Sequence, residues 1–130
     1  MSANLDLVRA IFAEWERGEF PAMPPWADPE IEFVIPDGPE PSTRVGTAAA
    51  PGIEAFLELW ETLRFDAEEY RELDDGSVLV MSRMRGRGAG SGVEVDQSRA
   101  SVFHLRNSKV TRLALYWDRE RALSYLGLEA

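Results

Sequence analysis

Two long alternating segments near the C-terminus, joined by a short polar turn, limit the possible folds of this chain more than any other feature. Residues 92–105 read GVEVDQSRASVFHL and residues 110–117 read VTRLALYW, with the turn RNSK between them. Alternation of apolar and polar residues is typical of strands that bury one face. Because so short a turn joins antiparallel neighbours, we expect a hairpin. The second strand runs directly into residues 118–127, where the apolar spacing becomes helical.

The rest of the sequence predicts further strands and two long helices. A helix over residues 5–17 carries apolar side chains at three- and four-residue steps, and a second helix begins near Pro51. The apolar stripe of the second helix consists of Ile53, Phe56, Leu57, Trp60 and Leu63. We expect strands at residues 31–35, 66–73 and 77–87. We interpret residues 36–46 as a loop, and FPAMPPWADPE, residues 20–30, as a short helical turn and a tight connection.

The C-terminal segment closes the chain with a helix that Asp118 can cap and Gly127 can end. Its Ala122, Leu123 and Leu126 are expected to face inward. Helices followed by an antiparallel meander predict an α+β fold, with a curved mixed or antiparallel sheet wrapped around the long N-terminal helix as a cone-shaped barrel. The cavity of such a cone is the default ligand site. No repeat or boundary divides the sequence, so we expect one domain over residues 1–130.

Charge and composition restrict the partners of the chain. The net charge is −9 among 130 residues, which argues against nucleic acid and anionic membranes. The sequence contains no cysteine and one histidine, so we expect no thiolate chemistry, no zinc site and no cofactor. No stretch has the length of a membrane span, and the N-terminus lacks the pattern of a signal peptide. These features predict a cytoplasmic location.

Four segments together resemble a known superfamily. They are FAEWERGEF…PWADPEIEF, GIEAFLELW, GRGAGSGVEV and FHLRNSKVTRLALYWDRERALSYLGL. In this order and spacing the sequence resembles the nuclear transport factor two-like superfamily, in particular its SnoaL-like branch, over nearly the whole chain. The resemblance implies the cone-shaped fold and a homodimer that assembles through the outer sheet face. Because this superfamily includes isomerases, epoxide hydrolases, polyketide cyclases, dehydratases and binding modules, the fold does not choose an activity.

The resemblance also shows which catalytic groups of the ketosteroid isomerases the chain lacks. Those enzymes use an aspartate base together with a tyrosine and a protonated acid that stabilise the enolate. The position of the base matches Ile35 and Pro36, which cannot accept a proton. The tyrosine position matches Ile11, and the acid position matches Ser101. A hydroxyl at Ser101 could donate a hydrogen bond, but no base accompanies it.

Two other activities of the superfamily lack their acids as well. Epoxide hydrolases need two aspartates and an arginine, and these positions match Arg83-Met84-Arg85 and Leu115. SnoaL-type cyclases use an acidic residue in the pocket without metal or cofactor. Asp118 is better explained as a helix cap, and Asp28 as a turn residue before Pro29.

Strand alternation assigns faces to the remaining candidates. Arg99, Ser101 and Phe103 share the face that corresponds to the pocket, and His104 lies on the opposite face, either exposed or at a dimer surface. Arg83 and Arg85 are either an inward guanidinium clamp for a carboxylate or enolate, or solvated partners of surface acids. The tryptophans either wall the pocket or pack in the core. The candidate pocket residues are Trp15, Trp26, Tyr70, Arg83, Arg85, Ser101, Phe103, Leu115 and Trp117.

The sequence leaves more than one function open. Our leading hypothesis is a small-molecule-binding protein with an apolar pocket for a hydrophobic or carbonyl-bearing organic molecule. It would be a cofactor-independent enzyme of the isomerase, cyclase or dehydratase kind if the pocket contains an ionisable group. The alternatives are a non-catalytic ligand-binding or dimeric interaction module, and an epoxide-hydrolase-like enzyme. The glycine-rich GRGAGSG, residues 86–92, precedes a strand rather than a helix, so we interpret it as a hairpin connection and not a phosphate loop.

Overall fold

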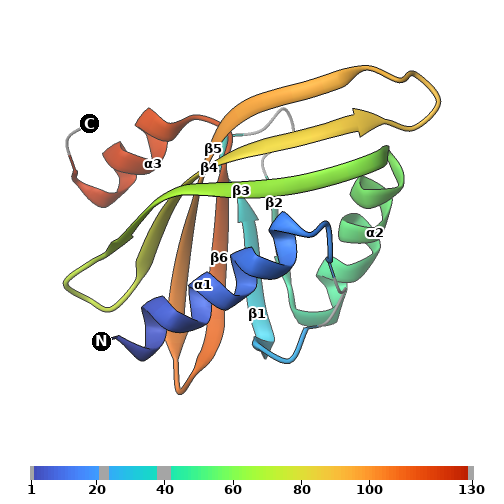
Figure 1. The fold of residues 1–130 in the computed structure, drawn as a ribbon. Helices are drawn as coiled ribbons and strands as arrows, with labels where there is room; N and C mark the ends of the chain where they lie inside the picture. The colour runs from blue at the N-terminus through green and yellow to red at the C-terminus, as the bar shows by residue number, and fades with distance from the viewer. Residues whose placement is uncertain (1, 21–23, 38–41, 129–130) are drawn as a thin grey trace.

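The fold comes from a computed structural model that describes residues 2–20, 24–37 and 42–128 (Figure 1). The helices are α1 (Ala3–Glu16), the short 3-10 helix η1 (Gly46–Ala49), α2 (Ala50–Glu58) and α3 (Arg119–Leu126). The strands are β1 (Ala27–Ile35), β2 (Ser42–Val45), β3 (Trp60–Glu72), β4 (Val78–Gly88), β5 (Glu94–Arg106) and β6 (Lys109–Tyr116).

The strands form one curved, mixed sheet. Their order is β2-β1-β6-β5-β4-β3, with β1 parallel to β6 and the other neighbours antiparallel. The helix α1 lies across one face, which we call the concave face (Figure 1). The opposite, convex face carries α3. The predicted α+β class and the mixed sheet around the N-terminal helix are confirmed, but the sheet does not close into a barrel: β2 and β3 are its edges within the described residues.

The sequence determines both ends and the buried side of α1. The Ser2 hydroxyl caps its first turn by accepting a hydrogen bond from the Leu5 amide at 3.1 Å. Gly18, just beyond its end, has a φ of +76°, a backbone conformation that residues other than glycine disfavour. Its apolar stripe, predicted from the sequence, faces the sheet and is buried at Val8, Ile11, Phe12 and Trp15.

Aromatic rings fill the concave face beneath α1. Trp15 is central, with its ring centroid 5.0 Å from Phe12, 5.8 Å from Phe65 and 6.0 Å from Phe103. We call the following set the aromatic cluster: Phe12, Trp15, Phe20, Trp26, Phe65 and Phe103. Offset and edge-on ring pairs at these separations stabilise a core beyond their area alone. The cluster therefore joins α1 to β3 and β5.

The convex face is covered by α3 as the sequence predicts. The Asp118 carboxylate accepts a hydrogen bond from the Glu120 amide at 2.9 Å, and Gly127 ends the helix with a φ of +71°. Ala122 and Leu123 pack against a group of apolar side chains that includes Leu79, Ala100, Val102, Ala114 and Tyr116. The two-residue turn of the β5–β6 hairpin has positive φ at Asn107 and Ser108, as a type I′ turn requires, so the predicted hairpin is confirmed.

The predicted second helix is too long. The helix α2 ends at Glu58, and β3 begins at Trp60 rather than at residue 66. Trp60 and Leu63 are therefore strand residues, and none of the described α2 side chains is buried. The turn at Leu59 ends the helix without interrupting the three- and four-residue spacing of apolar residues. Trp60 and Leu63 therefore continue a helical pattern although they belong to the strand. Trp60 still contacts α2, with its ring 6.0 Å from Phe56.

Three other boundaries differ from the sequence predictions. The predicted loop over residues 36–46 contains β2, which pairs with β1, while residues 38–41 lie outside the described part. The strand predicted at residues 31–35 begins earlier, at Ala27, and so replaces much of the predicted helical turn; residues 21–23 of that turn are outside the description. In GRGAGSG, the first three residues belong to β4, and the turn is correspondingly shorter.

Candidate functional site

Two hollows adjoin each other at one end of the concave side, where α1 ends and α2 approaches β3. The large cleft has a volume of about 850 Å³ and is open to solvent. The small hollow has a volume of about 240 Å³. Both are lined by Gly18, Glu61 and Leu63, so they form one continuous depression. A hollow of this total size is within the range of small-molecule sites.

The small hollow has an apolar wall. Phe20, Leu57, Trp60 and Leu63 line it, and Phe20 continues into the aromatic cluster through its contact with Phe65 at 6.0 Å. The Gly86 backbone lies close to the Thr62 carbonyl and to the Trp60 ring at this end of the sheet. A Cβ atom at Gly86 would lie 2.7 Å from the Thr62 carbonyl oxygen and 2.9 Å from the Trp60 ring. Glycine is therefore required where the large cleft meets Trp60.

The polar lining of the large cleft comes from α1, β3, β4 and β5, and it includes Arg85 and Asp96 as well as Glu16 and Thr62. The Glu16 carboxylate, at the end of α1, accepts a hydrogen bond from the Ala67 amide at 3.3 Å, beside an irregularity in the β3–β4 pairing. Burial raises the pKa of the Tyr70 phenol, the Glu16 charge raises it further, and the Arg9 charge, stacked 5.3 Å from the ring, lowers it. Glu16 is thus a solvent-accessible carboxylate at the edge of the aromatic cluster.

A second group of polar side chains lies on the concave face beyond the aromatic cluster. Ser82 of β4 pairs with Arg99 of β5, and Ser101 is two residues further along the same face. The Ser82 side chain is 0% exposed and its hydroxyl has no hydrogen-bond partner among the described residues; Ser101 is 1% exposed. The Arg99 guanidinium lies 4.9 Å from the centroid of the Trp117 ring. We call Ser82, Arg99 and Ser101 the concave polar patch.

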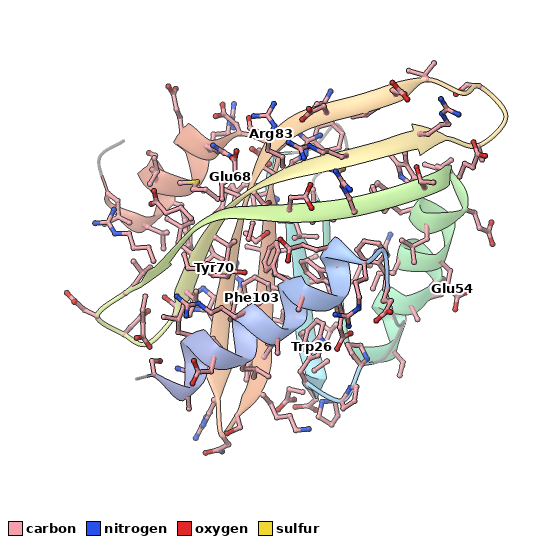
Figure 2. The ribbon with its side chains drawn as sticks, in the orientation of Figure 1. Trp26, Glu54, Glu68, Tyr70, Arg83 and Phe103 are labelled. Carbon is pink, nitrogen blue, oxygen red and sulfur yellow. The ribbon has the colours of Figure 1, made fainter. Side chains whose placement is uncertain are left out.

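The predicted clamp residues Arg83 and Arg85 are on the convex face, opposite the concave polar patch. Arg83 pairs with Asp96 at 2.7 Å, and Arg85 pairs with Asp66 at 2.9 Å. Figure 2 shows Arg83 near Glu68 and away from α1, whereas Tyr70 and Phe103 lie beside α1. The Asp96 hydrogen bond raises the pKa of Arg83, and the same contact lowers the pKa of Asp96. Both arginines are thus paired with acids, and Arg85, with Asp96, also lines the large cleft.

The structure brings several of the other candidates together. Trp15, Trp26 and Phe103 meet in the aromatic cluster, and Tyr70 touches its edge through Phe12, with ring centroids 6.1 Å apart. In these contacts the rings pack against one another in the core, which is the second of the two roles considered for the tryptophans.

The remaining candidates lie on the concave face beside the polar patch. Ser101 pairs with Leu115 of β6, and the ring of Trp117 adjoins Arg99. Leu115 is on the opposite face from Arg83 and Arg85, so the positions that match the epoxide hydrolase groups do not converge.

Sequence reasoning did not propose Ser82 or Glu16 as site residues, and it gave no role to Arg99; it named Trp60 only as a tryptophan that either walls the pocket or packs in the core. Alternation already placed Arg99 on the pocket face, but a sequence does not reveal which arginines have acidic partners. Ser82 carried a similar signal, because it alternates with Val80 and Met84 on an otherwise apolar face. Trp60 was assigned to the wrong element. Only the position of Glu16 in the last turn of α1 could have indicated its place near the sheet.

The other polar residues singled out in the sequence have structural surroundings. Asp28 accepts a hydrogen bond from the Glu30 amide at 2.8 Å, the geometry of a turn. His104 is half-buried on the convex face rather than exposed; burial and the Arg112 charge lower its pKa. In the described residues no three His, Cys, Asp or Glu side chains gather as a metal site requires. None of the described helices has the length and apolarity of a membrane span.

Comparison with solved structures defines the class of fold. An NTF2-like protein of unknown function from Burkholderia pseudomallei K96243 superposes with a TM-score of 0.77, at 18% identity over 95% of this chain and 97% of the other. TerC, co-crystallised with polyporic acid, gives 0.74 at 20% identity over 98% of both chains. A protein from Jannaschia sp. CCS1 with the provisional name of a SnoaL-like polyketide cyclase gives 0.73 at 19% identity, over 98% of this chain and 94% of that one.

The fold is therefore that of the nuclear transport factor 2-like proteins. A sequence model of the SnoaL-like domain matches residues 8–113, and the chain belongs to the SnoaL-like domain family. No curated protein sequence matches the chain. At 20% identity or below, these solved structures establish the fold but not the activity.

Proposed function

We propose that the protein binds a small, carbonyl-bearing organic molecule in the depression formed by the large cleft and the small hollow. The observation that carries this proposal is the junction of an apolar wall with accessible polar groups. Phe20, Leu57 and Trp60 offer apolar surface in the small hollow, while the adjoining cleft is lined mainly by charged side chains, among them Glu16 and Arg85. Sites for small molecules combine mostly apolar walls with a few polar groups that orient the ligand.

Family membership supports the same class of ligand. TerC shares the fold and was crystallised with polyporic acid, which makes this compound a sensible first probe. Binding to the folded chain raises the melting temperature, because the ligand adds free energy to the native state alone. We therefore expect polyporic acid, and the neutral aromatic amide 2-naphthamide, to raise the melting temperature in a concentration-dependent way.

Two matched leucine variants locate the site. Leu57 lines the small hollow, whereas Leu59 is 62% exposed and lines neither hollow. Leu57→Arg places a charged side chain in the hollow and should abolish the ligand-induced shift. Leu59→Arg adds the same charge nearby and should leave the shift unchanged. Absence of any shift in the wild-type protein, or a full shift in Leu57→Arg, would contradict the proposed site.

The position of Glu16 favours a second candidate function, in which the protein also removes a proton from its bound ligand and returns one. Its carboxylate lines the large cleft and can accept a proton from a carbon next to a carbonyl group. In D₂O, the deprotonated carbon would then take up a deuteron. No metal or cofactor is needed for this exchange, since the carboxylate is the base and the solvent returns the deuteron.

The exchange can be measured on 2-tetralone, a carbonyl compound with acidic α-protons, by NMR. The second candidate predicts that wild-type protein accelerates loss of the α-proton signal and that Glu16→Gln does not. Glutamine keeps an oxygen that can accept the Ala67 amide hydrogen bond, so the fold should persist. Glu54→Gln is the control, because Glu54 lies on the outer side of α2 (Figure 2). Equal rates with and without protein would leave ligand binding as the function.

Dimerisation through the convex face is the remaining part of the proposal. It is supported by the homodimer that the family resemblance implies and by the exposed ion pairs of this face, such as Arg83–Asp96. Size-exclusion chromatography with light scattering should give twice the chain mass of 14.6 kDa. A monomer mass at micromolar concentration would contradict it.

A further inference from the structure

We propose that the concave polar patch recognises the negative charge of an organic anion, a carboxylate or an ionised enol, carried by the ligand. This inference rests on the proposed function, because it names the class of ligand that the concave side selects. The Arg99 guanidinium supplies the charge, and the Ser82 hydroxyl supplies a neighbouring donor.

The first observation is the unused hydrogen-bonding capacity of Ser82. Its side chain is fully buried, and within the described residues its hydroxyl has neither donor nor acceptor. Leaving a buried hydroxyl unpaired destabilises a fold, so such groups are uncommon unless a ligand or water completes them. Ser82 lies on the concave face, directly opposite Arg99 in the β4–β5 pairing.

The second observation is the state of the Arg99 charge. None of the ion pairs formed among the described residues involves Arg99, in contrast to Arg83 and Arg85 on the other face. Its guanidinium is half-buried and donates to the Ser98 carbonyl at 2.9 Å and to the Gln97 side-chain oxygen. A guanidinium with neutral partners keeps its full charge for an incoming anion.

One acid lies close enough to affect this charge. Asp37 raises the pKa of Arg99, while burial lowers it by more. The two Asp37 carboxylate oxygens already accept hydrogen bonds from the Trp117 amide at 2.8 Å and the Asp118 amide at 2.9 Å. Asp37 thus accepts hydrogen bonds from backbone amides just beyond β6, and no hydrogen bond joins it to the Arg99 guanidinium among the described residues.

The patch lies within reach of the proposed ligand site. Val95 on β5 lines the large cleft, and Arg99 is four residues further on the same face, about 13 Å along the strand. The exposed face of Trp117 provides an aromatic surface beside the guanidinium. An aromatic anion can therefore place its rings on apolar surface and its charged oxygens toward Arg99, an arrangement that a neutral analogue cannot use equally well.

The experiment compares a carboxylate with its neutral counterpart. 2-Naphthoate and 2-naphthamide have the same rings and differ in charge, and ¹H–¹⁵N NMR titration follows both the Arg99 Nε–H and the tryptophan indole signals. Wild-type protein should bind 2-naphthoate at least about tenfold more tightly, the scale of one charge-assisted pair in a partly buried site. Arg99→Gln should remove this preference and leave the affinity for 2-naphthamide unchanged.

Two further variants separate recognition from folding and from net charge. Arg121→Gln removes an exposed positive charge from α3 and should keep the preference for the carboxylate. Ser82→Ala should weaken 2-naphthoate binding by severalfold while raising the melting temperature, since it removes an unpaired buried hydroxyl. A purely structural role of Ser82 would not give these opposite changes.

The outcomes distinguish this inference from the proposed function. Equal wild-type affinities for the two probes, or an unchanged preference in Arg99→Gln, would overturn the anion site while leaving small-molecule binding intact. A preference lost equally in Arg121→Gln would show that net charge, not Arg99, attracts the carboxylate, and would also overturn it. Failure of both probes to bind would refute both proposals.

Discussion

Both faces of the sheet bury an apolar core, the larger one on the concave face, and they differ in the partners of their arginines and serines. On the convex face, Arg83 and Arg85 pair with acids, although His104 and Arg112 each leave one buried nitrogen without a hydrogen-bond partner among the described residues. On the concave face, Ser82 is buried without a partner and Arg99 has only neutral partners among the described hydrogen bonds.

This difference assigns separate roles to the two faces. Arg83 and Arg85 already pair with acids and have less free charge for a small charged ligand than Arg99. A surface with unused donors next to aromatic rings is suited to one, because the ligand completes hydrogen bonds that the protein leaves open. We therefore propose ligand recognition on the concave face, and packing against α3 together with the proposed dimer contact on the convex face.

The largest expected effect concerns the aromatic cluster. Phe103→Ala removes a fully buried ring that contacts Trp15 and Phe12, and should lower the free energy of unfolding by about 3–5 kcal/mol. The adjacent Val102→Ala, buried on the convex face, should lower it by about 2 kcal/mol. Urea denaturation measures both. Equal costs would show that the cluster is not the main source of concave-face stability.

Two serine variants should change stability in opposite directions. Ser82→Ala removes an unpaired buried hydroxyl and should raise the free energy of unfolding by about 1 kcal/mol. Ser77→Ala removes a hydroxyl that donates to Asp75 at 2.6 Å and should lower it by about the same amount, about 1 kcal/mol. Denaturant midpoints at pH 7 provide the comparison. A loss of stability in Ser82→Ala would mean that its hydroxyl already has a partner.

The only histidine gives a pH-dependent test of the convex face. Burial, and then the Arg112 charge, lower the pKa of His104 below its ordinary value of 6.5, so the unfolded chain takes up the proton first. Stability should therefore decrease as the pH falls through 6.5, and is fully present above it. Melting temperatures at pH 7.5 and 5.5 should differ by less in His104→Gln than in the wild type. An identical pH dependence in the variant would contradict this role.

The smallest effect is expected for the exposed ion pair between Arg83 and Asp96. Both side chains are solvent-accessible, so solvent screens their attraction and ordering them costs entropy. A double-mutant cycle with Arg83→Gln and Asp96→Asn should give a coupling free energy close to zero. A clear coupling would indicate that the convex ion pairs contribute to the fold more than their exposure implies.

The sequence predicted what depends on periodicity. It located α1, the faces of β4 and β5, the turn at Asn107 and Ser108, and the cap at Asp118. These features depend on local spacing and local backbone chemistry, which a single sequence contains.

The sequence did not predict features that depend on contacts between distant segments. The α2–β3 boundary was missed because Trp60 continues the helical spacing after the helix has ended. The pairing irregularity between Ala67 and Glu69 changes which β3 residues face α1, and no spacing rule anticipates it. For the same reason, the ion pairs of Arg83 and Arg85, and the absence of an ion pair at Arg99 within the described part of the chain, became visible only in three dimensions.

The most direct test of ligand recognition on the concave face is the site of chemical-shift change when 2-naphthoate is titrated into ¹⁵N-labelled wild-type protein. The account predicts that the largest changes occur at the Trp60 indole, the Gly86 amide and the Arg99 Nε–H, with small changes at Ala122 and Met81 beside α3. Changes centred on the residues beside α3 would contradict it, as would a spectrum that 2-naphthoate leaves unaltered.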